Sequence, residues 1–173
     1  MRRLALIGVL ASCYAPDVGG GSDAAAAVDA PAMCESDWTL DEDTGTCKRY
    51  VDDRPRTWIE AELDCRSRFQ AHLAVAPSRL ERDWLSTRAT SSQWVGLFRP
   101  SAVDPWRWVT GETESMPEWD PGGADGGELC AYLSPQGAAK GGLLGATLSC
   151  TFDYEFVYFC ERDGEPGIPL PSW

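Results

Sequence analysis

The sequence predicts an α+β domain with two helices, several short strands and a long loop, stapled by disulfides. Short aromatic and apolar runs bounded by Gly, Pro and Asp are typical of strands in an antiparallel arrangement. Two further stretches begin with helix-capping residues. The seven cysteines lie on a chain that starts like an exported protein, which favours disulfides. The length of 173 residues suits one domain with extensions.

The strand expected at the centre of the sheet is Trp94-Val95-Gly96-Leu97. Tryptophan and valine favour a buried, pleated surface, and a glycine inside the run indicates that another backbone approaches closely. A second short strand carries Trp106 and Trp108 in alternation. We expect these tryptophans to fill the core. For Trp106 and Trp119 an exposed role in ligand contact is the alternative.

Two helices are predicted from capping boxes, in which the capping residue is followed three positions later by a glutamate. The first helix starts at Thr57 and the second at Ser78. We expect Leu63 near the buried face of the first helix and Leu80 on the buried face of the second. Further strands are expected at residues 38–40, 47–50, 72–75, 130–133 and 156–160, with a turn and strand within 141–150.

The net charge of -12 argues against DNA or RNA as a partner, because a nucleic-acid surface needs a positive patch. A zinc site is not expected, since there is one histidine and no Cys-x-x-Cys pair. The chain has no Gly-x-Ser-x-Gly or comparable nucleophile motif, so we expect no enzyme.

The first 13 residues are predicted to be a signal peptide with a lipobox. Met1-Arg2-Arg3 forms a positive start, and residues 4–10 form a short apolar segment. The following Leu10-Ala11-Ser12-Cys13 resembles a bacterial lipobox, in which the cysteine becomes the lipidated first residue of the mature chain. Tyr14 after the cysteine implies sorting to the outer membrane. Plain secretion and a coincidental apolar start are the alternatives.

Residues 14–33 are rich in Gly, Ala and Asp, so we predict a flexible tether there. Acyl chains on Cys13 would anchor the protein to a membrane without a transmembrane helix. The expected location is therefore the bacterial outer membrane or cell surface, or alternatively the medium. At the other end, residues 163–173 form a Pro-rich tail that cannot join a sheet interior.

Apart from Cys13, the cysteines form an even set, which behind an export signal implies disulfides. Spacing alone cannot choose among the fifteen connectivities that six cysteines allow. The six are Cys34, Cys47, Cys65, Cys130, Cys150 and Cys160.

In order and spacing, these pieces resemble the C-type lectin-like domain of the long form, from about Cys34 to residue 162. The resemblance implies two helices flanking two small antiparallel sheets, with a long loop that carries ligand recognition. It also implies the disulfides Cys65–Cys160, Cys130–Cys150 and Cys34–Cys47. The residues that carry it are Cys47, Trp58, Ala61, Cys65, Leu73-Ala74, Glu81, Trp84, Trp94-Val95-Gly96-Leu97, Trp106-Arg107-Trp108, Gly111, Trp119, Glu128-Leu129-Cys130, Cys150 and Phe159-Cys160-Glu161.

Sugar-binding members of this family hold calcium with a Glu-Pro-Asn or Gln-Pro-Asp tripeptide, a glutamate near a cysteine and a Trp-Asn-Asp run. Here the matching positions read Asp120-Pro121-Gly122, Glu128 and Gly145-Ala146-Thr147. Two carboxylates are too few for a cation that takes six to eight oxygens. We therefore expect no resident cofactor, and calcium binding through Glu128 and Asp120 on the order of millimolar or weaker.

The long loop from Thr113 to Gly127 is expected to be functional, as long loops in compact domains usually are. The acids in this loop and just before it, which include Glu112, Glu114, Glu118 and Asp125, either rebuild a different cation site or only solvate the loop. Ligand recognition is predicted to rest on Trp119, Glu118, Asp120, Asp125 and Glu128.

The predicted function is a cell-surface binding module of C-type lectin type. It recognises a glycan or protein ligand without the usual calcium-coordinated sugar site. The alternative is a structural or adhesive envelope lipoprotein with an inert ligand loop. Sulfatase-activating enzymes share a related fold, but they are larger than this chain. We therefore do not expect catalysis.

Overall fold

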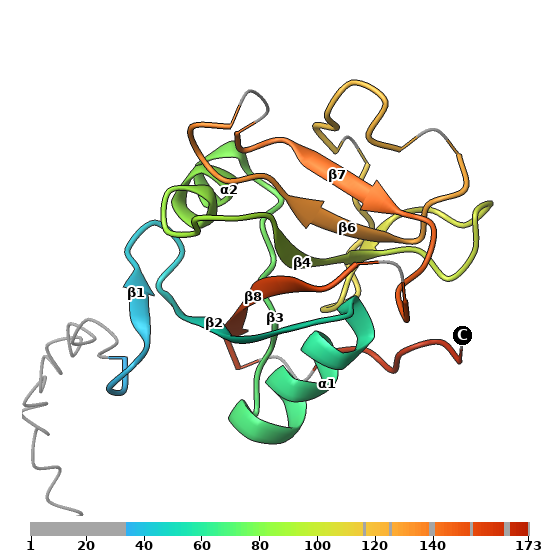
Figure 1. Ribbon diagram of the computed structural model, residues 1–173. Helices are drawn as coiled ribbons and strands as arrows, with labels where there is room; N and C mark the ends of the chain where they lie inside the picture. The colour runs from blue at the N-terminus through green and yellow to red at the C-terminus, as the bar shows by residue number, and fades with distance from the viewer. Residues whose placement is uncertain are drawn as a thin grey trace, which may run out of the picture. The chain divides into compact units, whose positions relative to one another are not determined.

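The computed structural model describes residues 34–115, 117–124, 126–138, 141–152, 154–164 and 167–172 (Figure 1). The predicted signal peptide, Cys13, the tether over residues 14–33 and Asp125 lie outside the described residues.

The strands form one mixed sheet in the order β1-β2-β8-β4-β6-β7, with β3 beside β8 and β5 beside β4. Their bounds are β1 Thr39–Asp41, β2 Thr46–Arg56, β3 His72–Leu73, β4 Gln93–Phe98, β5 Arg107–Trp108, β6 Cys130–Leu133, β7 Leu144–Thr147 and β8 Phe156–Arg162. The predicted α+β, disulfide-stapled fold class is confirmed. We expected two small sheets, but β4 pairs with β8 in parallel through Trp94 and Tyr158. This pairing joins the strands into one hydrogen-bonded network.

The two helices are α1, Trp58–Phe69, and α2, Arg79–Ser86. Both begin at the predicted capping boxes: the Glu60 carboxylate accepts the Thr57 backbone N–H at 3.1 Å, and that of Glu81 accepts the Ser78 backbone N–H at 2.9 Å. The hydrogen bond from Thr57 also lowers the pKa of Glu60. Neither helix in the described part of the chain has the apolar length that crossing a membrane requires.

Two predictions about the helix faces are wrong. Leu63 is 51% exposed and Leu80 is 66% exposed. On α1, Leu63 lies two residues from both Ala61 and Cys65, which are buried. Two steps along a helix turn a side chain by about 200°, so Leu63 points away from the face that these neighbours bury.

Strand β4 is buried along its whole length and divides the core into two halves. Trp94 packs on the side of α1 together with Trp58, whereas Val95 and Leu97 pack on the side of α2. Figure 1 shows the two helices on opposite sides of β4 and β8. The indole N–H of Trp58 donates to the carbonyl of Val95 at 2.8 Å, which ties α1 to the central strand. Trp94 and Trp108 therefore have the core role that we expected.

Gly96 has the close backbone approach that its position predicted. A Cβ atom at Gly96 would lie 2.7 Å from the carbonyl oxygen of Leu73 and 2.7 Å from a methyl group of Val109. The Gly96 N–H donates to Ala74 at 2.9 Å, and its carbonyl accepts from Val109 at 2.7 Å. Any side chain here would push these neighbouring segments apart.

Three disulfides join Cys65 to Cys160, Cys130 to Cys150, and Cys34 to Cys47, which is the pairing that the family resemblance implies. The Cys65–Cys160 bond closes a sequence separation of 95 residues. In the chain-entropy picture such a loop stabilises the fold by roughly 4–5 kcal/mol.

The C-terminal tail packs against the domain, which the sequence did not reveal. The Ile168 N–H donates to the Val109 carbonyl at 2.6 Å, and Arg66 on α1 donates to the Ile168 carbonyl at 2.8 Å. The side chains of Ile168 and Leu170 lie against the α1 half of the core. The tail joins no sheet interior, but its side chains cover part of the α1 half of the core.

Candidate ligand-binding site

The long loop is fixed to the first residue of β7. The Leu144 N–H donates to the carbonyl of Glu118 at 3.0 Å, and the Asp120 N–H donates to the carbonyl of Leu144 at 2.7 Å. Trp119 thereby forms a parallel bridge with Leu144. Glu118, Trp119 and Asp120, three of the predicted ligand residues, are thus held against β7 by backbone hydrogen bonds.

After Asp120 the chain makes a tight turn, in which the Gly123 N–H donates to the Asp120 carbonyl at 2.6 Å. A Cβ atom at Gly123 would lie 2.7 Å from that carbonyl oxygen and 2.9 Å from the carbonyl oxygen of Leu144. Glycine is therefore required for the loop to lie against β7. Asp120 itself is buried, with 7% of its surface exposed.

Glu118 is engaged by α2. Its carboxylate lies 2.6 Å from a guanidinium nitrogen of Arg82 and 3.6 Å from one of Arg79. The hydrogen bond from Arg82 and its positive charge lower the pKa of Glu118. Arg82 is almost wholly buried and also donates to the carbonyls of Ala76 and Pro77. Glu118 thus neutralises a buried guanidinium and ties the loop to the helix.

Trp119 packs on Trp106, with ring centroids 4.8 Å apart at an interplanar angle of 54°. Trp106 is 9% exposed and Trp119 is half-buried at the edge of the α2 half of the core. The core role expected for Trp106 agrees with its burial. Trp119 is only partly buried, although the Trp106 ring packs against it.

Glu128 lies two residues before β6, where Arg99 contacts it. The side chains of Arg99 and Glu128 are 11% and 16% exposed, with a nitrogen–oxygen separation of 3.7 Å. The Arg99 Nε–H donates to the Glu128 carbonyl at 2.6 Å, and Nη1–H donates to the Ala102 carbonyl at 2.9 Å. The Gly126 N–H donates to the Glu128 carboxylate at 2.8 Å. A guanidinium therefore supplies positive charge next to this glutamate.

The third matching position, at the end of β7, is poor in oxygen donors toward a ligand. Ala146 has no side-chain oxygen, and the Thr147 hydroxyl donates to the Ser149 carbonyl at 2.8 Å. The Leu129 N–H donates to the Thr147 carbonyl at 2.7 Å, so Glu128 lies beside this end of the strand. Asp120, by contrast, is hydrogen-bonded to Leu144 at the other end of β7. Leu144 and Thr147 are three residues apart, which is about 10 Å along an extended strand.

These positions do not fit a calcium ion. Calcium takes six to eight oxygen ligands, preferably carboxylates and carbonyls. The matching positions contribute Asp120 and Glu128, which the backbone separates along β7, and Glu128 already pairs with Arg99. Within the described residues, no group of three or more His, Cys, Asp or Glu side chains is placed to hold a metal ion.

A pocket of about 450 Å³ opens beside Glu128. Its other walls are Ala146, Thr147, Leu148 and Tyr154. Leu148 and Tyr154 are 65% and 54% exposed. This pocket occupies the position where the family's third ligand run lies, and its walls combine the polar Glu128 and Thr147 with the apolar Leu148 and the aromatic Tyr154.

Our sequence reasoning missed the segment between β7 and β8, which carries three exposed apolar side chains: Leu148, Phe152 and Tyr154. The Tyr154 ring stacks on Phe156 with centroids 5.7 Å apart and an interplanar angle of 22°. The Phe156 ring in turn packs against the ring of the core residue Trp94, with centroids 4.6 Å apart. The exposed ring is therefore the outer member of a packed aromatic column. The density of apolar residues in so short a connection was the available signal.

A family model for the lectin C-type domain matches residues 54–162, well over half of the chain. The protein belongs to the C-type lectin domain family. The human C-type lectin domain family 10 member A is 35% identical over 92 residues, which cover 47% of this chain and 28% of that protein. Among the curated relatives compared, the match spans between 8% and 60% of the relative's own length.

Solved C-type lectin domains have the same fold. The mouse scavenger receptor C-type lectin carbohydrate-recognition domain matches with a TM-score of 0.60 and 26% identity, over 75% of this chain and 98% of that domain. A calcium-independent type II antifreeze protein matches with a TM-score of 0.63 and 20% identity, over 75% of this chain and 94% of that protein. The antifreeze match shows the fold alone.

In this C-type lectin domain, the predicted ligand residues fall into two groups rather than one. Glu118, Trp119 and Asp120 lie at the start of β7, where they anchor the long loop. Glu128 lies at the other end of β7 and lines the pocket with Tyr154. Asp125, the fifth predicted residue, lies outside the described residues.

Proposed function

We propose that this C-type lectin domain is an exported binding module that recognises a glycan in the pocket beside Glu128, without a calcium-coordinated sugar. The observation that carries the proposal is the contact between Arg99 and Glu128. In the family's sugar site a metal cation draws acidic side chains together and orders the loops. Here a guanidinium with fixed hydrogen bonds takes that ordering role.

The chemistry of the pocket supports recognition through stacking and hydrogen bonds. An exposed aromatic next to a pocket with few polar groups is typical of binding sites. Tyr154 offers an aromatic face to the C–H side of a sugar ring, and the Glu128 carboxylate accepts hydrogen bonds from sugar hydroxyls. Because Tyr154 stacks on Phe156, little ordering entropy is lost when a ligand binds.

A carbohydrate-recognition domain among the similar structures supports the glycan part of this proposal. The mouse scavenger receptor domain is a carbohydrate-recognition domain, and the antifreeze protein is calcium-independent. We extend the first property to this chain as a proposal, because that domain matches 75% of this chain at 26% identity. The second shows that the fold exists in a protein that works without calcium.

We further propose that the domain is held at the cell surface by lipid on Cys13, with residues 14–33 as a tether. The lipobox resemblance and the Gly- and Ala-rich composition support this. Such a tether would let the pocket face outward, toward glycans of the surroundings or of another cell. Secretion without lipid would leave the same binding activity in the medium.

A glycan array probed with calcium and with excess chelator tests the proposal. We expect the same glycans to bind under both conditions. Tyr154→Ala should weaken binding about tenfold, or about 1.4 kcal/mol, since it removes the stacking face. The matched control Leu80→Ala removes an exposed apolar side chain from α2 and should leave binding unchanged. Loss of binding in chelator contradicts the proposal. A folded protein that binds no glycan supports the inert-loop alternative.

A further inference from the structure

The connection between β7 and β8 presents a second exposed aromatic ring close to Tyr154. Phe152 is 66% exposed, and within the described part of the chain its ring packs against no other aromatic ring. Its backbone is nevertheless fixed, because the Ser149 hydroxyl oxygen accepts the N–H groups of Phe152 at 3.3 Å and of Thr151 at 3.2 Å. Two residues along a chain span at most about 7 Å between Cα atoms. A fixed turn therefore holds one exposed ring next to another.

The polar side chains of the pocket beside Glu128 mostly accept hydrogen bonds. The Thr147 hydroxyl already donates to the Ser149 carbonyl at 2.8 Å, so its oxygen meets a ligand only as an acceptor. The ionised Glu128 carboxylate has no proton to donate. Of the polar side chains that line the pocket, only Tyr154 has a hydroxyl whose hydrogen can turn toward a ligand. Such a lining suits a ligand that donates through its own hydroxyl groups.

The guanidinium beside the pocket offers no donor to a ligand. Arg99 is not part of the pocket lining. Its Nε–H and Nη1–H donate to the carbonyls of Glu128 and Ala102, and its Nη2 lies 3.7 Å from the Glu128 carboxylate. An acidic ligand therefore cannot replace Glu128 as the partner of Arg99 without breaking contacts that order the loop.

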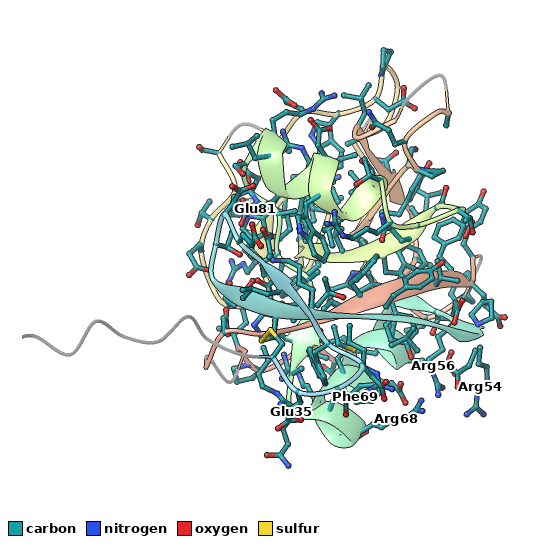
Figure 2. All side chains as sticks on the ribbon, turned by 90° about the vertical axis from the view of Figure 1, so that its left-hand side faces the viewer. Glu35, Arg54, Arg56, Arg68, Phe69 and Glu81 are labelled. Atoms are coloured by element: carbon teal, nitrogen blue, oxygen red, sulfur yellow. A yellow bond between two sulfur atoms is a disulfide. The ribbon has the colours of Figure 1, made fainter. Side chains whose placement is uncertain are left out.

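The arginine that lies across the sheet from Phe156 is also engaged. Arg56 faces Phe156 in the register of β2 and β8, and its guanidinium donates to the Tyr158 hydroxyl and to Asp64, both at 3.1 Å. Figure 2 shows Arg56 and Arg68 on the side of α1, where both contact Asp64. Their positive charge is spent within the protein.

The charge around the two rings is negative. The segment from residue 148 to residue 156 contains Asp153 and Glu155 and no lysine or arginine. Glu155 is exposed next to Tyr154. The whole chain has a net charge of -12, so an anionic ligand approaches against the field of the protein.

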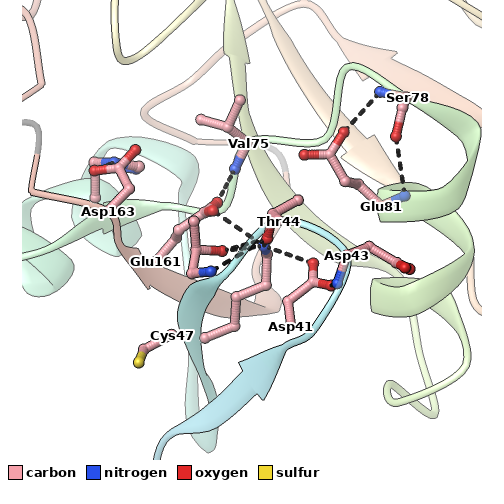
Figure 3. Close-up of polar contacts among 12 residues, drawn as sticks. Asp41, Asp43, Thr44, Cys47, Val75, Ser78, Glu81, Glu161 and Asp163 are labelled. Atoms are coloured by element: carbon pink, nitrogen blue, oxygen red, sulfur yellow. Dashed lines mark hydrogen bonds and ion pairs between the residues drawn. The ribbon is translucent and has the colours of Figure 1, made fainter. Parts of the chain in front are cut away.

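The other large hollow of the domain, of about 480 Å³, differs from this surface because the protein satisfies its polar groups. Figure 3 shows Glu161 between the Val75 N–H at 2.8 Å and the Lys48 ammonium at 3.0 Å. Among the described residues that line this hollow, the one aromatic side chain is Trp108, which is 2% exposed. The exposed rings are thus a property of the β7–β8 connection.

We infer that the pocket beside Glu128 and Phe152 together bind a neutral oligosaccharide of at least two rings, and that they reject glycans with carboxylate or sulfate groups. One sugar ring lies on Tyr154 and donates hydroxyl hydrogens to Glu128 and Thr147, while the next ring lies on Phe152. An acidic group at this surface meets like charge and acceptors that cannot donate to it. The inference rests on the glycan proposal for this pocket and adds the charge and the length of the ligand.

A glycan array with matched neutral and acidic pairs tests the charge preference. The pairs are cellotetraose with its C6-oxidised form, and lacto-N-neotetraose with its sialylated form, in chelator at low salt. The neutral member of a bound pair should bind at least about tenfold tighter, since like charges in an interface are costly. Added salt should reduce the difference, because it screens the repulsion. Equal or tighter binding of the acidic members overturns the inference and leaves the glycan proposal standing, whereas binding of no member overturns both.

The variant Phe152→Ala tests the second ring by calorimetry. It should weaken binding of the bound tetrasaccharide about tenfold and leave binding of the matching single sugar, glucose or galactose, unchanged. The matched control Leu80→Ala removes an apolar side chain with the same 66% exposure from α2 and should change neither. Thermal melting of Phe152→Ala should match that of the parent protein, since the ring is exposed. Unchanged tetrasaccharide affinity, or an equal loss for both ligands, would show that Phe152 holds no second ring.

Discussion

Arg99→Met should destabilise the protein strongly, because the Arg99 guanidinium joins two backbone segments and lies beside the Glu128 carboxylate. The guanidinium donates to two backbone carbonyls, those of Glu128 at 2.6 Å and Ala102 at 2.9 Å. It also lies 4.9 Å from the centroid of the Trp106 ring. Each charge-assisted hydrogen bond is worth about 1.5–3 kcal/mol. The substitution also leaves the mostly buried Glu128 carboxylate without its cation, a loss that typically costs about 3–5 kcal/mol.

These contributions overlap, because one guanidinium makes all of the contacts, so they are not added, and we expect Arg99→Met to lower the free energy of unfolding by about 3–5 kcal/mol. Denaturant unfolding with the disulfides intact measures this difference. Arg54→Met is the matched control, because it removes the same charge from an exposed residue (Figure 2), and it should change stability by less than about 0.5 kcal/mol. Arg99→Lys keeps the charge but loses the planar fork, so its loss should lie between the two.

A loss below about 1 kcal/mol in Arg99→Met would refute the argument, since the hydrogen bonds to two carbonyls would then contribute almost nothing. An equal loss in Arg54→Met would show that net charge, not the position of the guanidinium, is responsible. Hydrogen exchange gives a second readout: the amide of Gly126, which donates to Glu128, should lose protection in Arg99→Met more than the amides of β8 do.

Three further predictions follow from the same structure. Lys48→Met should lower the free energy of unfolding by about 3–5 kcal/mol in denaturant melts, since it leaves two buried carboxylates without a cation. A small loss would mean that they are protonated or hydrated. Removing the Cys34–Cys47 bond should cost about 2 kcal/mol less than removing the bond of Cys65, because its sequence separation is 13 rather than 95. The reverse order in thermal melts would contradict this. Cys13→Ser should abolish acyl labelling and release the protein into the soluble fraction, and unchanged labelling would exclude the lipid anchor.

The parts of the fold that sequence predicted are those set by local patterns. The β4 strand could be predicted because its apolar run needs a buried position, and the helix starts could be predicted because capping boxes act over three residues. The family resemblance added the disulfide pairing. Leu63 and Leu80 were misplaced because apolar residues were assigned to a buried face without regard to their angle around the helix.

The site was harder to predict because its contacts join distant residues. Arg99 and Glu128 are 29 positions apart, and no local pattern marks one as the partner of the other. Glu118 was expected in a ligand site, but α2 brings a buried arginine to it. Tyr154 was missed because its exposure depends on how the β7–β8 connection lies over the sheet.

The most direct test of calcium-free recognition is a calorimetric titration of calcium into the mature protein, followed by glycan titrations with and without chelator. We predict calcium affinity on the order of millimolar or weaker, and glycan binding that chelator does not change. Micromolar calcium affinity, or chelator-sensitive sugar binding that Glu128→Ala abolishes, would show that the loop holds a working calcium site.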